Sequence, residues 1–261
     1  MRMNVFTVAS IALVVSLFFV LHGCSKREKI TQLSQLDGKE FAVPTGTIAD
    51  KLVLSRFPNA KFKYFNSVLD AALAVGTGKA DAAAYDEPIL KNIAAKNPGV
   101  VVLPEMITND AYGFAVRPDS RDLKKTIDLV VSEFKNNGTY DAMMQRWFPK
   151  TGNPAPMPHI ALKGDKGVLT FGTAAVTEPF SFVDGSRNIV GFDIELARNI
   201  ARKLGMNLEV VNMDFGAMIP ALTAGKVDMI GACITITEER AKKVLFSEPY
   251  YNGGIAALVK K

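Results

Sequence analysis

The sequence predicts an α/β protein built from two blocks, each a mostly parallel sheet covered by helices. Three observations point to this class. Short apolar runs alternate with amphipathic stretches from Glu40 onward, the same alternation restarts at Gly167, and a proline-rich segment separates the two blocks. Strands that alternate with helical patterns are typical of parallel sheets with helices on their faces.

The first block contains seven expected elements. We expect strands at 40–45, 60–65, 80–86 and 99–105, and helices at 47–57, 67–79 and 87–97. Two further helices, 120–138 and 139–148, follow this block, with Ser120 and Gly138 as the caps of the first.

Prolines at 149, 154, 156 and 158 then mark an extended linker, which we expect to offer few apolar groups to a core. The second block has expected strands at 168–174, 208–213 and 226–234, and helices at 191–206 and 217–225. The segments "GKADAAA" (78–84) and "GKVDMIG" (225–231) both place Gly, Lys, an apolar residue and Asp before a strand. This echo favours two lobes built on one plan.

Composition and charge exclude several functional classes. The chain has 261 residues, 48% of them hydrophobic and 22% charged, which is an ordinary globular balance. Its net charge of +5 comes from basic residues scattered among acidic ones, so nucleic-acid binding is not expected. The two histidines, His22 and His159, lie in the N-terminal segment and the linker. A histidine-based active site or zinc site is therefore disfavoured, no cofactor is expected, and binding is the simpler hypothesis.

The N-terminal segment has the layout of an export signal. Arg2 precedes an apolar run that ends at Leu21, and Gly23 stands directly before Cys24. A transmembrane helix is the alternative, but the run is at the short end of the spanning range. "LHGC" resembles the lipobox of bacterial lipoproteins, although its His22 is unusual, and this implies a lipid on Cys24. Cys233 then has no disulfide partner and is expected to be a small buried hydrophobe.

The stretch "TITEER" carries the most informative charge. Thr237 is a candidate helix N-cap, two acids follow it, and Arg240 comes next. A cation near a helix start is unfavourable unless an anion compensates it. A surface ion pair with Glu239 or Asp193 is one explanation, and a bound carboxylate held by the planar guanidinium is the other.

The segment from "GFDIELARNIARKLGM" to "ITITEERAKKVLFSEPYYNGG" closely resembles the first lobe of periplasmic amino-acid-binding proteins, the family 3 solute-binding proteins of ABC transporters. "LDGKEFAVPTGTIAD", "GKADAAAYDEP" and "AYGFAVRPDSRDLKKTIDLVV" resemble the rest of that family's fold. The resemblance implies a type II periplasmic binding protein-like fold, with two lobes and a hinge that close on an amino acid.

The resemblance also implies roles for individual residues. Arg240 and Thr235 match residues that hold the ligand's α-carboxylate, Thr47 matches a second carboxylate contact, and Asp86 matches the acid that holds the α-ammonium. Asp86 has an alternative as the N-cap of the helix at 87–97.

Phe215 matches an aromatic that packs on the ligand, and a plain core phenylalanine is its alternative. Ile48 and Cys233 complete the candidate ligand-binding set. Ala174, Thr177 and Pro44 depart from the residues that relatives often carry, so the ligand's side chain stays open.

The order of the segments differs from that of the family, because the second-lobe block comes first. Circular permutation explains this order, and a piece of a longer tandem is the alternative. The expected organisation assigns each part of the chain as follows: signal and lipobox cysteine 1–24, small (second) lobe 36–105, hinge strand and returning helices 106–148, linker 149–166, and large (first) lobe with a hinge strand 167–261.

We therefore expect a monomeric, lipid-anchored receptor in the periplasm or at the cell surface, which hands an amino acid to an ABC permease. A cyclohexadienyl dehydratase-like enzyme on the same fold and a sensory module without transport are the alternatives.

Overall fold

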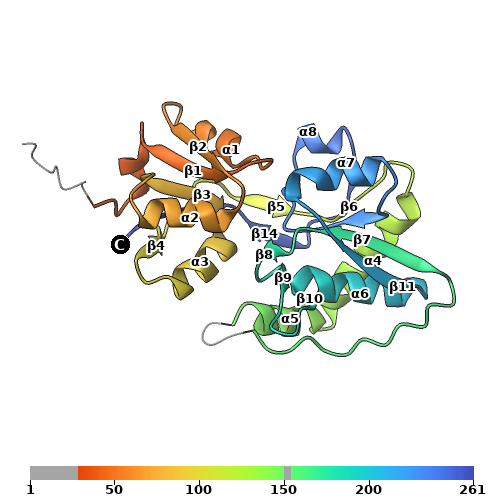
Figure 1. Ribbon diagram of the computed structural model, residues 1–261. Helices are drawn as coiled ribbons and strands as arrows, with labels where there is room; N and C mark the ends of the chain where they lie inside the picture. The colour runs from red at the N-terminus through yellow and green to blue at the C-terminus, as the bar shows by residue number, and fades with distance from the viewer. Residues whose placement is uncertain (1–28, 150–153) are drawn as a thin grey trace, which may run out of the picture.

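The computed structural model describes residues 29–149 and 154–261, and Figure 1 shows two bodies joined by a narrow waist. We call them the small lobe (29–108 and 254–261) and the large lobe (113–149 and 154–250). The predicted signal, Cys24 and residues 150–153 of the predicted linker lie outside the described residues. Within the described part of the chain, no helix combines the length and apolarity needed to cross a membrane.

The small lobe contains a five-stranded sheet in the order β2-β1-β3-β15-β4. Its strands are β1 (Glu40–Pro44), β2 (Lys61–Phe65), β3 (Ala82–Asp86), β4 (Val100–Val102) and β15 (Ile255–Lys260). β1, β2 and β3 are parallel, whereas β15 runs antiparallel to both β3 and β4. The last strand of the chain thus completes a sheet begun more than 200 residues earlier, and Figure 1 places the C-terminus at this lobe.

Helices cover both faces of this sheet. They are η1 (Leu33–Leu36), α1 (Ala49–Arg56), α2 (Val68–Gly76) and α3 (Glu87–Lys96). Along β15, Ala256 and Leu258 pack with α2 and α3, and Ala257 and Val259 pack with η1 and α1. A strand buried on both faces is typical of a sheet sandwiched between helices.

The large lobe repeats this plan with the order β11-β7-β12-β6-β13. Its strands are β6 (Ala115–Val116), β7 (Val168–Thr173), β11 (Asn207–Asn212), β12 (Met229–Ile230) and β13 (Leu245–Phe246). Here β7, β11 and β12 are parallel and β6 is the antiparallel strand. The fourth strand of each sheet, β15 in the small lobe and β6 in the large lobe, therefore follows a segment of chain that crosses over from the other lobe.

Helices of the large lobe are α4 (Arg121–Asn136), α5 (Thr139–Trp147), α6 (Phe192–Leu204), η2 (Phe215–Ala217), α7 (Met218–Thr223) and α8 (Glu238–Ala241). A small sheet of β8 (Val176–Thr177), β9 (Ser181–Val183) and β10 (Ile189–Val190) completes it. The predicted helix caps are partly right: Gly138 follows α4 with a positive φ of 79°, but the Ser120 side chain makes no capping hydrogen bond to α4.

Two antiparallel strands carry the chain between the lobes: β5 (Asp110–Tyr112) and β14 (Tyr251–Gly253). Tyr112 and Tyr251 are paired in this ladder, and their rings stack with centroids 5.7 Å apart. The predicted two-lobed α/β fold with a hinge is confirmed. The linker offers two apolar side chains to the core: Met157 and Leu162 are partly buried and pack against the main apolar cluster.

Candidate functional site

Arg240 is a buried cation beside the boundary between the lobes. Arg240 is only 8% exposed. Its Nη1 donates a 3.0 Å hydrogen bond to the Thr235 carbonyl, and its guanidinium carbon lies 5.5 Å from the centre of the Phe215 ring. Among the described residues, no carboxylate lies within ion-pair distance of this guanidinium, so neither Glu239 nor Asp193 forms the ion pair that was the alternative. Burial lowers the Arg240 pKa, and the nearby Asp86 opposes this shift.

The helix that contains Arg240 is shorter than expected. Thr237 is the N-cap, and its Oγ1 accepts a 3.2 Å hydrogen bond from the Arg240 amide, as expected. The helix it caps, however, is the single turn α8, so Arg240 lies in the last turn as well as the first. A one-turn helix has no appreciable dipole penalty for a cation at this position. The cost at Arg240 comes instead from burying a charge.

Asp86 ends β3 and lies at the N-cap position of α3, but its side chain makes no capping hydrogen bond. The Tyr112 hydroxyl donates to its Oδ1, and the Cys233 thiol lies 3.7 Å from its Oδ2. Asp86 is 5% exposed, and burial raises its pKa from 3.8 to about 7, against the opposing effect of these two hydrogen bonds. The capping alternative therefore describes the position of Asp86 and not the use of its carboxylate.

A second buried carboxylate, Asp193 at the start of α6, was not predicted as a site residue. Its Oδ2 accepts hydrogen bonds from the Cys233 amide at 3.2 Å and the Tyr250 hydroxyl at 3.0 Å. Its Oδ1 is buried without a hydrogen-bond partner among the described residues. Burial raises the Asp193 pKa to about 7. Cys233 thus lies between Asp86 of the small lobe and Asp193 of the large lobe.

Cys233 itself is buried and reduced, as expected for a cysteine without a disulfide partner. Its backbone has a φ of 48°, which is unusual outside glycine. This conformation directs the amide toward Asp193 and leaves the thiol beside Asp86. Burial and the two carboxylates raise the pKa of the thiol well above its usual value.

A cavity of about 750 Å³ lies between the lobes and brings four predicted residues together. Thr47 and Ile48 reach it from the small lobe, and Phe215 and Arg240 reach it from the large lobe. Its wall is completed by Gly46, Lys51, Gly216, Met218, Ile219, Pro220, Thr223, Ile234, Glu239 and Lys243.

The other three predicted residues, Asp86, Thr235 and Cys233, do not line this cavity. They are buried beside it: Cys233 and Thr235 flank Ile234, which lines the cavity, and Asp86 contacts the Cys233 thiol. The Thr47 hydroxyl donates to the Pro44 carbonyl at 2.9 Å. Phe215 is partly buried: it packs against an apolar cluster of the large lobe and also lines the cavity.

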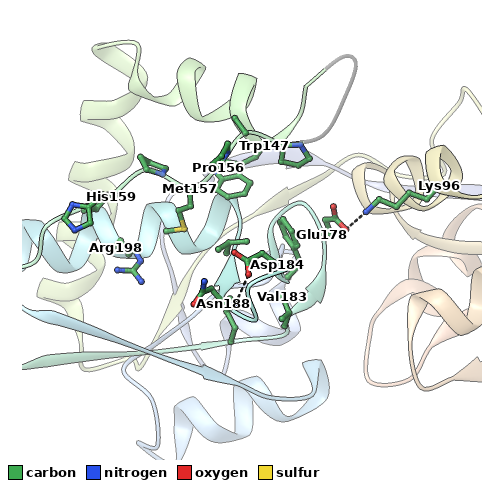
Figure 2. A pocket seen from close by; sticks show the side chains of 18 residues that line it. Lys96, Trp147, Pro156, Met157, His159, Glu178, Val183, Asp184, Asn188 and Arg198 are labelled. Carbon is green, nitrogen blue, oxygen red and sulfur yellow. Dashed lines mark hydrogen bonds and ion pairs between the residues drawn. The ribbon is translucent and has the colours of Figure 1, made fainter.

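A second cavity, of about 820 Å³, lies where linker residues 154–160 pass over the large lobe (Figure 2). Trp147, Met157 and Arg198 line it, and the ion pair between Lys96 of α3 and Glu178, 2.6 Å long, closes one end. None of the predicted ligand-binding residues contributes to it. Ala174 and Thr177, the departures noted above, are each 1% exposed, and the Thr177 hydroxyl donates to the Ala174 carbonyl, so both belong to the interior.

Comparison with known proteins finds matches to the C-terminal part of the chain. Residues 169–261 match the family described as bacterial extracellular solute-binding proteins, family 3. The arginine-binding extracellular protein ArtP of Bacillus subtilis is 44% identical over 96 residues, which cover 37% of each chain. A probable histidine-binding protein of Campylobacter jejuni is 42% identical over 83 residues, which cover 32% of each. The chain thus spans about a third of the length of these curated relatives.

Among solved structures, the arginine-bound form of domain 1 from TmArgBP is 47% identical. The match covers 36% of this chain and 81% of that one, with a TM-score of 0.33.

Proposed function

We propose that this protein binds an amino acid between its lobes and delivers it to an ABC permease, because residues 169–261 match family 3 of the bacterial extracellular solute-binding proteins. The relatives are named for binding arginine, histidine and cystine, which supports an amino acid as the ligand class. In this proposal the protein is a monomeric receptor, not an enzyme, and a lipid on Cys24 anchors it outside the cell membrane.

The observation that carries the proposal is the state of Arg240. A guanidinium that is buried and has no carboxylate partner is costly, and a bound carboxylate removes that cost. Arg240 borders a cavity whose opposite wall, at Thr47, belongs to the other lobe. A ligand held by both residues therefore links the two lobes.

Asp86 supplies the complementary charge. In the proposed complex its ionised carboxylate receives the α-ammonium, while Arg240 and the Thr47 hydroxyl donate to the α-carboxylate, the hydroxyl by turning from the Pro44 carbonyl to which it now donates. Thr235 and Cys233 lie beside these groups, and Ile48 and Phe215 pack on the ligand. A zwitterion then satisfies both buried charges at once, which neither a simple cation nor a simple anion can do. The side chains of Tyr112 and Cys233 must move or share the carboxylate for this contact to form.

A calorimetric screen tests the proposal. The purified protein is titrated with each of the 20 common amino acids, and at least one is expected to bind at a single site. Acetate and ethylamine, which each carry only one of the two charges, serve as controls and are expected to bind far more weakly. If none of the amino acids binds, the proposed function is wrong.

We also propose that one chain supplies a complete cleft, in the circularly permuted order. The supporting observation is β15, which follows the large lobe in sequence and yet pairs with β3 and β4 of the small lobe. Small-angle scattering tests this arrangement: a saturating ligand is expected to leave a monomer and reduce its radius of gyration. A ligand-bound dimer of exchanged lobes would favour the tandem alternative.

A further inference from the structure

The charges around the interlobe cavity are unbalanced. Three basic side chains border it, Arg240, Lys51 and Lys243, against the single carboxylate of Glu239. The remaining lining residues are apolar, glycine or threonine. Since Asp86 is buried outside the lining, the cavity has an excess of positive charge.

The two lysines are available to a ligand. Lys51 pairs with Glu239 at 2.6 Å, but both side chains are about two-thirds exposed (63% and 65%). An exposed pair of this kind contributes little to stability, so a ligand carboxylate can share Lys51 with little loss. Lys243 forms no ion pair within the part of the chain that the structure describes, and its charge acts on Glu239, whose pKa the neighbouring lysines lower.

The α-groups of an amino acid account for only part of this charge. Its carboxylate neutralises Arg240 and its ammonium neutralises Asp86, which leaves Lys51, Lys243 and Glu239 with a net charge of +1. A negatively charged ligand side chain balances that excess, whereas a cationic side chain adds to it. Ile48 and Ile219 offer apolar contacts to the methylene groups between the two ends of the ligand.

Resting on the proposed function, we propose that the amino acid has an acidic side chain, whose distal carboxylate lies against Lys51 and Lys243 at the rim of the cavity. Glutamate and aspartate are the simplest ligands of this class. Glutamine is the matched neutral analogue of glutamate, because it has the same shape without the charge.

Isothermal titration calorimetry with L-glutamate, L-aspartate, L-glutamine and L-arginine tests the proposal at 20 mM and 300 mM salt. At low salt, the better of the two acidic ligands is expected to bind about tenfold more tightly than glutamine, and arginine is expected to bind more weakly still. The difference should shrink at high salt, because both lysines are at a solvent-exposed rim.

Substitutions distinguish the contribution of the charged residues at the rim of the cavity from that of the other lining residues. Lys243→Gln is expected to remove most of the difference between glutamate and glutamine, and Glu239→Gln, which frees Lys51, is expected to increase it. Lys242→Gln is the control, since Lys242 is also exposed, adjoins Lys243 in sequence and does not line the cavity. It should leave the difference unchanged.

Two results would overturn the inference of an acidic ligand, and only the second would also overturn the proposed function. If glutamine or arginine binds as tightly as the acidic ligands, the charge argument fails while the proposed amino-acid receptor stands. If no amino acid binds at all, the proposed function fails, and the inference fails with it.

Discussion

The carboxylate of Asp86 and the thiol of Cys233 meet across the boundary between the lobes, with Oδ2 and Sγ 3.7 Å apart. Asp86 belongs to the small lobe and Cys233 to the large lobe, 147 residues apart in sequence. The Tyr112 hydroxyl, from a strand that crosses between the lobes, donates to the same carboxylate. The Asp86 carboxylate, proposed to receive the ligand's ammonium, is therefore hydrogen-bonded to a strand of the hinge.

The first prediction concerns the pH dependence of folding stability. Burial raises the Asp86 pKa from 3.8 to about 7, so the folded chain holds this proton more tightly than the unfolded chain. The contribution of Asp86 is therefore most favourable below about pH 4 and is lost as the pH rises toward 7. Asp86→Asn removes this loss. We therefore expect the change in the free energy of unfolding caused by Asp86→Asn to be more stabilising at pH 8 than at pH 5, by about 1 kcal/mol or more.

Urea unfolding of the ligand-free protein at the two pH values measures this difference. Asp122→Asn is the control, because that side chain is 98% exposed and its removal tests the loss of a carboxylate at the surface. An Asp86→Asn effect that is the same at pH 5 and pH 8 would contradict the assignment.

The second prediction uses the Cys233 thiol as a reporter of lobe separation. The thiol is 1% exposed and its pKa is raised by burial, so alkylation by iodoacetamide requires the lobes to move apart. We expect slow alkylation of the free protein and a further reduction of about tenfold or more when the ligand is saturating. Mass spectrometry of the peptide that contains Cys233 measures the rate.

Cys233→Ser gives the background labelling in this experiment. Labelling of Cys233 at the rate of an unhindered thiol in native buffer, with or without ligand, would show that the closed contact with Asp86 does not persist in solution.

The third prediction concerns the exposed ion pair between Lys96 and Glu178. It joins α3 of the small lobe to the large lobe at 2.6 Å, and its side chains are 53% and 25% exposed (Figure 2). Pairs of this exposure contribute about 0–1 kcal/mol, so Lys96→Glu should weaken ligand binding by only about two- to fivefold. The double variant Lys96→Glu/Glu178→Lys should regain most of that loss, and 0.5 M salt should reduce both effects. Failure of the double variant to recover would mean that the pair does not couple to closure.

The fourth prediction compares two glycines that meet between the lobes. Gly46 has a φ of 79°, and a Cβ built on it lies 3.1 Å from the Gly216 Cα, whereas a Cβ on Gly216 lies at an ordinary 3.5 Å from the Gly46 Cα. Gly46→Ala therefore adds backbone strain of about 1 kcal/mol to a tight contact.

We expect Gly46→Ala to weaken ligand binding measurably, and Gly216→Ala, the matched control, to change it much less. Titration calorimetry on the two variants checks this order. The reverse order would mean that the lobes approach each other differently when the ligand is bound.

The sequence was a good guide to elements that depend on local patterns. The strands and helices expected at 40–105 and 168–234, the capping Thr237 and the glycine after α4 all follow from residues within a few positions of one another. Arg240 was identified for a partly wrong reason, because the length of α8 was not readable from the sequence and the helix stops after one turn.

The contacts that complete the site depend on distant parts of the chain. Tyr112 reaches Asp86 from 26 residues away and Asp193 reaches Cys233 from 40 residues away, and no local pattern marks either pair. The partial burial of Met157 and Leu162 was missed for the same reason, since a proline-rich segment shows no periodicity that would reveal a contact with the large lobe.

The most direct test of the account is the affinity of Arg240→Ala for the amino acid that the wild-type protein binds best. Removing one partner of a buried charge pair costs about 2–5 kcal/mol, so the dissociation constant should rise by at least about 30-fold. Lys242→Ala, an exposed cation two positions along, should bind like the wild type. Undiminished binding by a folded Arg240→Ala protein would contradict the assignment of this guanidinium to the ligand's carboxylate.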